Sequence, residues 1–195
     1  AHLDFNLGWL DDPDPVQAIA DHHRLAKETQ DKDRRSAAEI VLVTNPATSY
    51  YSIGAERETL YANLIHEYLP RIGAPYDVIC IDDLADAPQY KLYIFADVYY
   101  LTQQQRDVIN QTVKRDDKTA LWFYAPGFVT QTGLSDSAMK DLTGIDIAHL
   151  GSRSRARLVL TDVQHPITQG VKPGFMMEML SEAGPVIYCR DPDAR

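Results

Sequence analysis

The chain has 195 residues, of which 45% are hydrophobic and 24% are charged, as is typical of one globular domain with or without a flanking arm. A net charge of −9 repels phosphate backbones and anionic lipids, which argues against nucleic acid and membrane surfaces as partners. No apolar run approaches the roughly 18 residues of a membrane span, and no charged and apolar leader follows Ala1. The compartment stays open, with the cytoplasm favoured.

Residues 1–35 are predicted to form an N-terminal arm with one helix. Pro is tolerated at the first helical position and Asp caps helices, so Asp12-Pro13-Asp14-Pro15 favours a helix start. An apolar stripe predicts a helix to about Gln30; its members are Val16, Ile19, Ala20, His23 and Ala26. The charged segment 28–37 lacks such a stripe and predicts a solvated linker. The compact domain is therefore expected over 36–195, with a C-terminal truncation left open because 191–195 is a loop sequence.

Strand and helix patterns alternate through the compact domain. Apolar runs rich in β-branched and aromatic residues predict strands over 39–44, 76–81, 90–95 and 118–124. Apolar stripes and capping residues predict helices over 56–69, 102–113 and 135–142. Less regular strand-like runs follow at 155–160 and 185–189. The alternation predicts a flavodoxin-like, doubly wound, mainly parallel sheet of five to six strands, in the order 2-1-3-4-5, with helices on both faces.

Ligands of doubly wound sheets bind beyond the carboxyl ends of the strands. Candidate ligand-binding residues at these ends are Thr44, Asn45, Asp97 and Tyr124. The hydroxyls of the loop Thr44–Ser52 could bind phosphate as a flavodoxin loop does, but no GxGxxG and no P-loop glycine-lysine accompanies them. An ordinary polar loop stays the alternative, as does a capping role for Asp97. We predict no cofactor.

Residues 124–127 occupy the strand-to-helix turn where related hydrolases carry a nucleophile. The expected tip is Ala125, which has no nucleophilic atom, and Tyr124 is a poor nucleophile at its ordinary pKa near 10. Cys80 falls inside a predicted strand, where a free cysteine behaves as a small hydrophobe, and it forms no CxxC pair with Cys189. No catalytic residue is predicted.

The histidines and paired aspartates point to no metal or acid–base site. His22 and His23 are adjacent and point about 100° apart on a helix, while the other histidines stand in separate segments. Paired aspartates at 11–12, 82–83 and 116–117 are typical of turns and caps. We predict no metal.

Aromatic residues gather around the predicted strand ends. The candidates for an interface are Tyr50, Tyr51, Tyr99, Tyr100 and Trp122. Aromatic side chains of this kind belong either to the core and rim of the sheet or to an interface with another domain or subunit.

Several phrases, in order, resemble the middle domain of beta-galactosidase-like glycoside hydrolases of family 42 and its relatives. The phrases are 73–77 (GAPYD), 81–84 (IDDL), 90–95 (YKLYIF), 118–127 (KTALWFYAPG) and 142–145 (LTGI). The resemblance covers about 36–150 well. It implies a class I glutamine-amidotransferase-like fold without the nucleophile, which follows a catalytic (β/α)8 barrel and builds the oligomer interface as a trimerisation domain.

The resemblance also implies a role in carbohydrate metabolism and indicates the neighbours of the chain. Residues 4–13 look like the exit from the barrel, so the implied partners are a missing catalytic barrel and further copies of the chain. The carboxylates for sugar cleavage lie on barrel strands in that family, so none is carried over to this sequence. Arg153, Arg155 and Arg157 do not match the pattern.

Three functions therefore compete. The first is a non-catalytic structural and oligomerisation domain of a glycoside hydrolase. The second is a free-standing flavodoxin-like enzyme or small-ligand binder that uses the loop Thr44–Ser52, Asp97 and Tyr124. The third is a sugar-binding receptor lobe, which normally requires two lobes where this sequence predicts one.

Overall fold

The computed structural model describes residues 13–33, 35–52, 62–115, 117–155, 157–159, 164–178, 182 and 184–191. The chain divides into two compact units, Ala1–Ser36 and Ala37–Arg195. The first contains α1 (Pro13–Glu28), with Asp14 in its first turn and Lys27 in its last, as the helix dipole favours. This confirms the predicted helix, whereas the resemblance of 4–13 to a barrel exit falls almost wholly outside the described residues. No described helix combines the length and apolar character needed to cross a bilayer.

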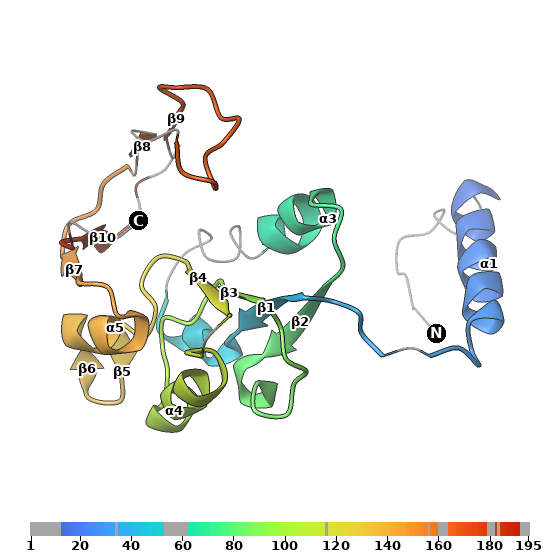
Figure 1. The fold of residues 1–195 in the computed structure, drawn as a ribbon, viewed down its shortest axis with the longest axis horizontal. Coiled ribbons are helices and arrows are strands. Elements are labelled where there is room, and N and C mark those ends of the chain that lie inside the picture. Colours follow the sequence, from blue (N-terminus) through green and yellow to red (C-terminus); the bar gives the residue numbers. More distant parts are fainter. Residues whose placement is uncertain are drawn as a thin grey trace. The chain divides into compact units, whose positions relative to one another are not determined.

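The second unit is built on a parallel sheet of four strands (Figure 1). Its strands are β1 (Ile40–Thr44), β2 (Tyr76–Cys80), β3 (Leu92–Phe95) and β4 (Thr119–Trp122). They pair in the order β2-β1-β3-β4 with every pair parallel, which confirms the predicted order for these strands. The buried run of β1 occupies the centre, as its uninterrupted apolar sequence requires.

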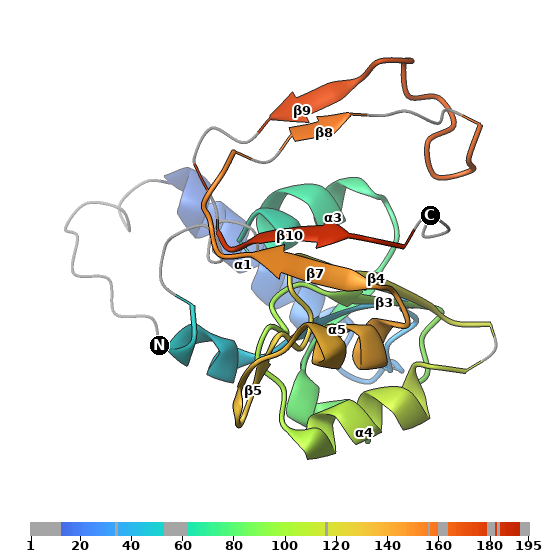
Figure 2. The same cartoon turned by 90° about the vertical axis from the view of Figure 1, so that its left-hand side faces the viewer.

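The predicted count of five to six strands is wrong, because the later strands pair elsewhere. β7 (Ile147–Leu150) pairs antiparallel with β10 (Val186–Cys189), and β8 (Arg157–Val159) pairs with β9 (Met176–Glu178). Figure 1 shows β7 and β10 to the left of the main sheet, and Figure 2 shows β8 and β9 above the β7–β10 ribbon. Along β10, half-buried residues give way to exposed ones. A strand without a fully buried residue suits an antiparallel ribbon better than the inside of a parallel sheet.

Helices cover both faces of the main sheet, as predicted. On one face, α4 (Gln103–Thr112) packs Ile109 against Val41 and Phe95. On the other face, a π-helical turn (Leu64–Tyr68) and the following α3 (Leu69–Arg71) pack against Leu42 and Ile94. Figure 1 shows α3 and α4 on opposite sides of the sheet. The fold is therefore a doubly wound α/β domain.

Two helix starts predicted from the sequence are confirmed. Thr102 caps α4 through a capping box, in which its hydroxyl accepts from Gln105 N and the Gln105 amide accepts from Thr102 N. Ser135 caps α5 (Asp136–Thr143) by accepting from Ala138 N at 3.1 Å. Between β4 and α5 lies a short hairpin of β5 (Val129–Thr130) and β6 (Gly133–Leu134).

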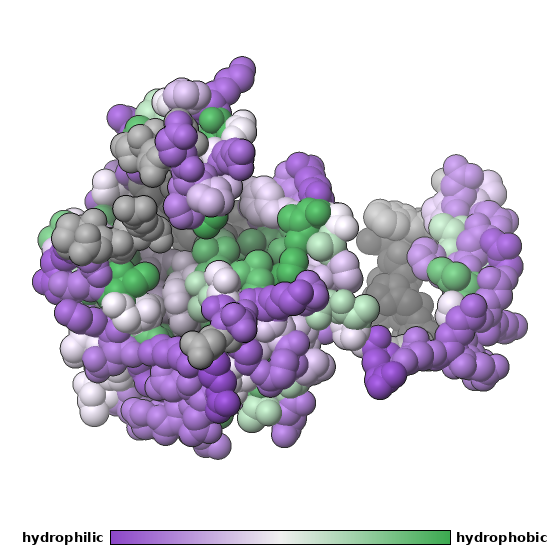
Figure 3. Space-filling view, in the orientation of Figure 1, coloured by the Kyte–Doolittle hydropathy of each residue, from purple (hydrophilic) through white to green (hydrophobic). Residues whose placement is uncertain are grey.

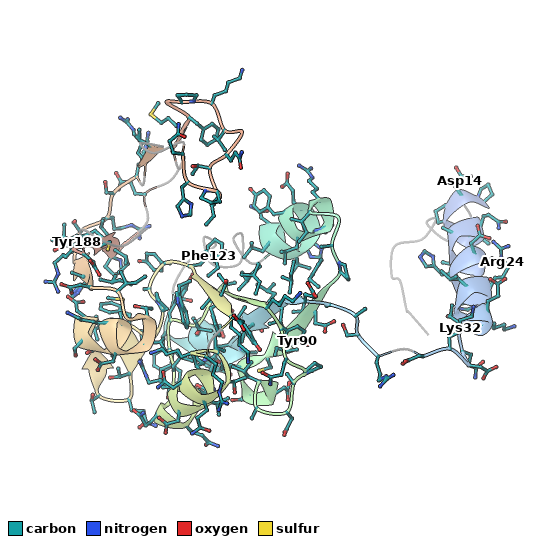
Figure 4. All side chains as sticks on the ribbon, viewed as in Figure 1. Asp14, Arg24, Lys32, Tyr90, Phe123 and Tyr188 are labelled. Carbon is teal, nitrogen blue, oxygen red and sulfur yellow. The ribbon has the colours of Figure 1, made fainter. Side chains whose placement is uncertain are left out.

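Tyr90 is a buried tyrosine that contacts the edge strand β2 (labelled in Figure 4). Its hydroxyl donates to the Asp77 carboxylate at 2.8 Å, and its ring meets Tyr93 edge-on at 5.8 Å. Burial, followed by the hydrogen bond to Asp77 and the negative charge of that carboxylate, raises the pKa of Tyr90 to about 12. The folded chain therefore holds this proton to higher pH than the unfolded chain does.

The raised pKa predicts alkaline destabilisation. The contribution of Tyr90 is present below about pH 10, and we expect about 2–3 kcal/mol of unfolding free energy to be lost as the pH rises to about 12. In urea unfolding at about pH 9 and about pH 11.5, Tyr90→Phe should reduce this loss. Tyr50→Phe, at a side chain 87% exposed, is the control and should leave it unchanged. An equal loss in wild type and Tyr90→Phe would contradict the assignment.

Candidate functional site

The carboxyl ends of β1 and β3 bring two predicted site residues together. Asn45 directly follows β1 and Asp97 follows β3, and the two side chains are 1% and 3% exposed. The Asp97 carboxylate accepts a hydrogen bond from Asn45 N at 2.9 Å. The Asn45 side chain donates to Tyr100 O at 2.7 Å and accepts from Ala47 N at 3.1 Å. The structure thus joins residues 52 positions apart in the sequence.

These contacts hold the two loops to each other. The Asn45 amide spans both, because its oxygen caps the short turn Pro46–Tyr50 and its nitrogen reaches the loop after β3. Thr44, the last residue of β1, is 8% exposed. Buried polar groups need hydrogen-bond partners, and those of Asn45 and Asp97 are provided by the protein itself. Ligand binding by Thr44, Asn45 and Asp97 stays a prediction.

The turn after β4 differs from the predicted elbow. The residue with left-handed backbone is Tyr124, at φ +60, whereas the expected tip, Ala125, is 1% exposed. Gly127, at φ +66, supplies a second left-handed residue. β4 ends at Trp122 and Phe123 N still donates to Phe95 O, so the chain turns at the next residue. Left-handed backbone is uncommon for residues other than glycine. Its presence at Tyr124 therefore indicates that the surrounding structure holds this turn in place.

The Tyr124 side chain is engaged on two sides. Its hydroxyl donates to Pro185 O at 2.6 Å, just before β10, and its ring meets Tyr99 edge-on at 5.2 Å. The side chain at the elbow therefore ties the main sheet to the β7–β10 ribbon. Ligand binding by Tyr124 also stays a prediction.

Three of the five predicted interface residues form a surface group, which we call the tyrosine cluster: Tyr50, Tyr51 and Tyr100. Tyr50 is 87% exposed, and the ring of Tyr51 stacks on Tyr100 with centroids 4.3 Å apart. The other two pack inward. Tyr99 is buried, and Trp122 stacks on Phe95 at 4.3 Å within the core beneath α4.

Arg106 on α4 is a buried cation that sequence reasoning missed. Its side chain donates to Ala138 O at 2.9 Å and to Gly127 O. A Cβ at residue 127 would lie 2.7 Å from Arg106 Nη2, so glycine leaves room for the guanidinium. Burial lowers the pKa of Arg106, and the nearby Asp141 opposes that shift. The polar sequence around Arg106 gave no sign of burial, because its partners lie 21 and 32 residues away.

A groove of about 320 Å³ lies beside Arg106, between α4, α5 and the β5–β6 hairpin. Its polar lining includes Gln103, Asn110, Gln131 and Asp141. None of the predicted ligand-binding residues lines it. Its residues come from three separate segments, so no sequence pattern announced it.

His149 on β7, which stood alone in the sequence, is paired in the structure. Its Nδ1 lies 2.6 Å from Asp136 Oδ1 at the start of α5, and its ring packs against Phe128. In the described part of the chain, no three histidine, cysteine or carboxylate side chains come together as metal ligands.

The comparisons with known proteins add little to this doubly wound domain. No family model matches the sequence, and the comparison with curated proteins found no match. Among solved structures, the chain is similar to the beta-galactosidase from Bifidobacterium adolescentis, with a TM-score of 0.41 and 12% identity over 56% of each chain. The chain thus spans little more than half the length of that protein. A likeness at this level defines neither fold nor function.

Proposed function

We propose that this chain is a non-catalytic structural domain that associates with further copies of itself through the tyrosine cluster. The observation that carries the proposal is the exposure of Tyr50, at 87%, beside the stacked pair Tyr51 and Tyr100. Tyr51, whose ring is held by its stacked neighbour Tyr100, loses little conformational entropy on binding, and aromatic anchors dominate interface energetics. The sequence phrases resembling glycoside hydrolases of family 42 support a place beside a catalytic barrel, in an assembly with further copies of the chain.

The polar residues at the strand ends support a structural role as well. Asn45 and Asp97 bind backbone groups of the loops that follow β1 and β3, and Tyr124 binds the backbone before β10. Each of these contacts fixes one part of the fold to another. Side chains that hold the fold together in this way do not readily exchange hydrogen-bond partners during a reaction.

Self-association is the test of the proposal. Sedimentation velocity from about 1 to about 200 μM should show reversible association of the wild-type chain. The double variant Tyr50→Ser/Tyr51→Ser should weaken it about tenfold or more, since interface anchors contribute over about 1 kcal/mol each. Tyr68→Ser, at a tyrosine 49% exposed beside α3, is the matched control and should change nothing.

Two results would overturn the proposal. One is a strict monomer over the whole range, and the other is turnover of a galactoside by the purified chain. The small-ligand alternative has its own readout, because FMN, nucleotides and simple sugars can be added to a melting assay. A ligand at 100 times its Kd would stabilise the fold by about 2.7 kcal/mol and raise the melting temperature visibly.

A further inference from the structure

Among the residues that the structure describes, β4 is an edge strand whose outer backbone groups pair with no other strand. Thr119 N donates to Lys91 O and Phe123 N to Phe95 O, so the groups of residues 119, 121 and 123 face β3. Because successive residues of a strand face opposite ways, Ala120 and Trp122 turn their N–H and C=O groups outward. Within the described ranges, β3 is the only strand that pairs with β4.

This edge lacks two of the features by which proteins protect exposed strands, which are charged residues and proline. Thr119–Trp122 contains no charge and no proline, and Leu121 is 45% exposed. The opposite edge, β2, carries Asp77. Charged residues and proline normally prevent strand edges from pairing with other chains. On a chain of net charge −9, a strand without carboxylates is also where another copy approaches with least repulsion.

The side chains along this edge divide between the two faces of the sheet. Ala120 and Trp122 pack toward the core beneath α4. Leu121 lies beside Ile94 in the strand register, on the face that α3 covers. Figure 3 shows apolar surface on that face next to α3. A strand added to β4 would therefore cover Leu121 as well as the outward backbone groups.

We infer that a second copy of this chain pairs antiparallel with β4 about a two-fold axis at Leu121. Ala120 then lies opposite Trp122 of the second copy, and each of the two such pairs exchanges two hydrogen bonds, roughly four in all. Leu121 meets Leu121 of the second copy in the non-hydrogen-bonded position between them, where side chains approach closest. The interface uses the same residues on both sides, as two-fold symmetry requires.

The inference rests on the proposed self-association and adds a second surface to it, distinct from the tyrosine cluster. The neutral composition of β4 and the symmetric placement of its outward groups favour another copy over an unrelated partner. A strand from elsewhere in the same chain, seated on this edge, is the competing occupant. It would satisfy the same backbone groups at every protein concentration.

Crosslinking tests the register directly. In a Cys80→Ser/Cys189→Ser background, Leu121→Cys should form a covalent dimer on mild oxidation, because Cβ atoms of such a pair lie about 4.5 Å apart. The matched control is Val78→Cys, on the opposite edge strand and the same face, at 43% exposure. It should stay monomeric under the same conditions. Absence of the dimer in Leu121→Cys, or equal yields in both variants, overturns the inference.

Hydrogen exchange separates the possible occupants. The Ala120 and Trp122 amides should become at least tenfold more protected between about 1 and about 200 μM, and Leu121→Lys should abolish that change. Protection already complete at the lowest concentration overturns the inference in favour of the chain's own strand. If the tyrosine variants weaken self-association and Leu121→Lys does not, the inference about β4 is overturned and the proposed function stands. If only Leu121→Lys weakens self-association, the inference stands and the tyrosine cluster is not the interface.

Discussion

Replacing Arg106 with methionine is expected to lower the free energy of unfolding by about 3–5 kcal/mol, the largest single-residue effect foreseen for this chain. The arginine is 8% exposed and donates to Gly127 O and Ala138 O. Methionine keeps an unbranched apolar stem but ends before the guanidinium and removes both donors, which leaves two carbonyls without these bonds. Each hydrogen bond from a charged donor contributes about 1.5–3 kcal/mol.

Urea unfolding measured by circular dichroism checks this value against two further variants. Arg106→Lys should recover part of the loss, since one ammonium can serve one carbonyl well but does not match the guanidinium fork. Arg153→Met is the matched control, because that arginine is exposed and its change should stay within about 0.5 kcal/mol. A loss below about 1 kcal/mol for Arg106→Met would show that the groove rehydrates these carbonyls.

Asp97→Ala should cost about 2–4 kcal/mol of unfolding free energy, because the buried carboxylate satisfies the backbone N–H of Asn45. The loss should appear first as faster hydrogen exchange in the loops after β1 and β3, since this contact joins them. The same urea titration measures the global effect.

Asp97→Asn separates geometry from charge. The asparagine keeps an acceptor oxygen for Asn45 N and should lose less than half of what alanine loses. If Asp97→Ala and Asp97→Asn leave stability unchanged while the binding of some small molecule disappears, the carboxylate serves a ligand, and the flavodoxin-like binder regains favour.

The order of the main sheet could be predicted because its strands carry strong local signals. Residues 40–43 are all apolar, as is typical of a central strand, and right-handed crossovers leave few strand orders open. The strand count could not be predicted in the same way. Val186 and Ile187 could serve a fifth parallel strand or an antiparallel ribbon, and only the partner that β7 provides decides between them.

The candidate site could likewise be predicted only in part. The sequence placed Asn45 and Asp97 at one edge of the sheet, because both follow strands. It could not show that the two satisfy each other, which depends on loop geometry across 52 residues. Arg106 was missed altogether, since a charged residue on a polar helix surface looks solvated until its distant carbonyl partners are known.

The close fit of Gly127 against Arg106 has a consequence for how this domain diverges. A methyl group at residue 127 would also come within 2.9 Å of Leu142 Cδ2, so the space is limited from two directions. Across homologues, a lineage that gains a side chain at 127 should therefore shorten the residue at 106 or 142 at the same time. The residues at positions 106, 127 and 142 should therefore co-vary, while neighbouring surface positions vary independently.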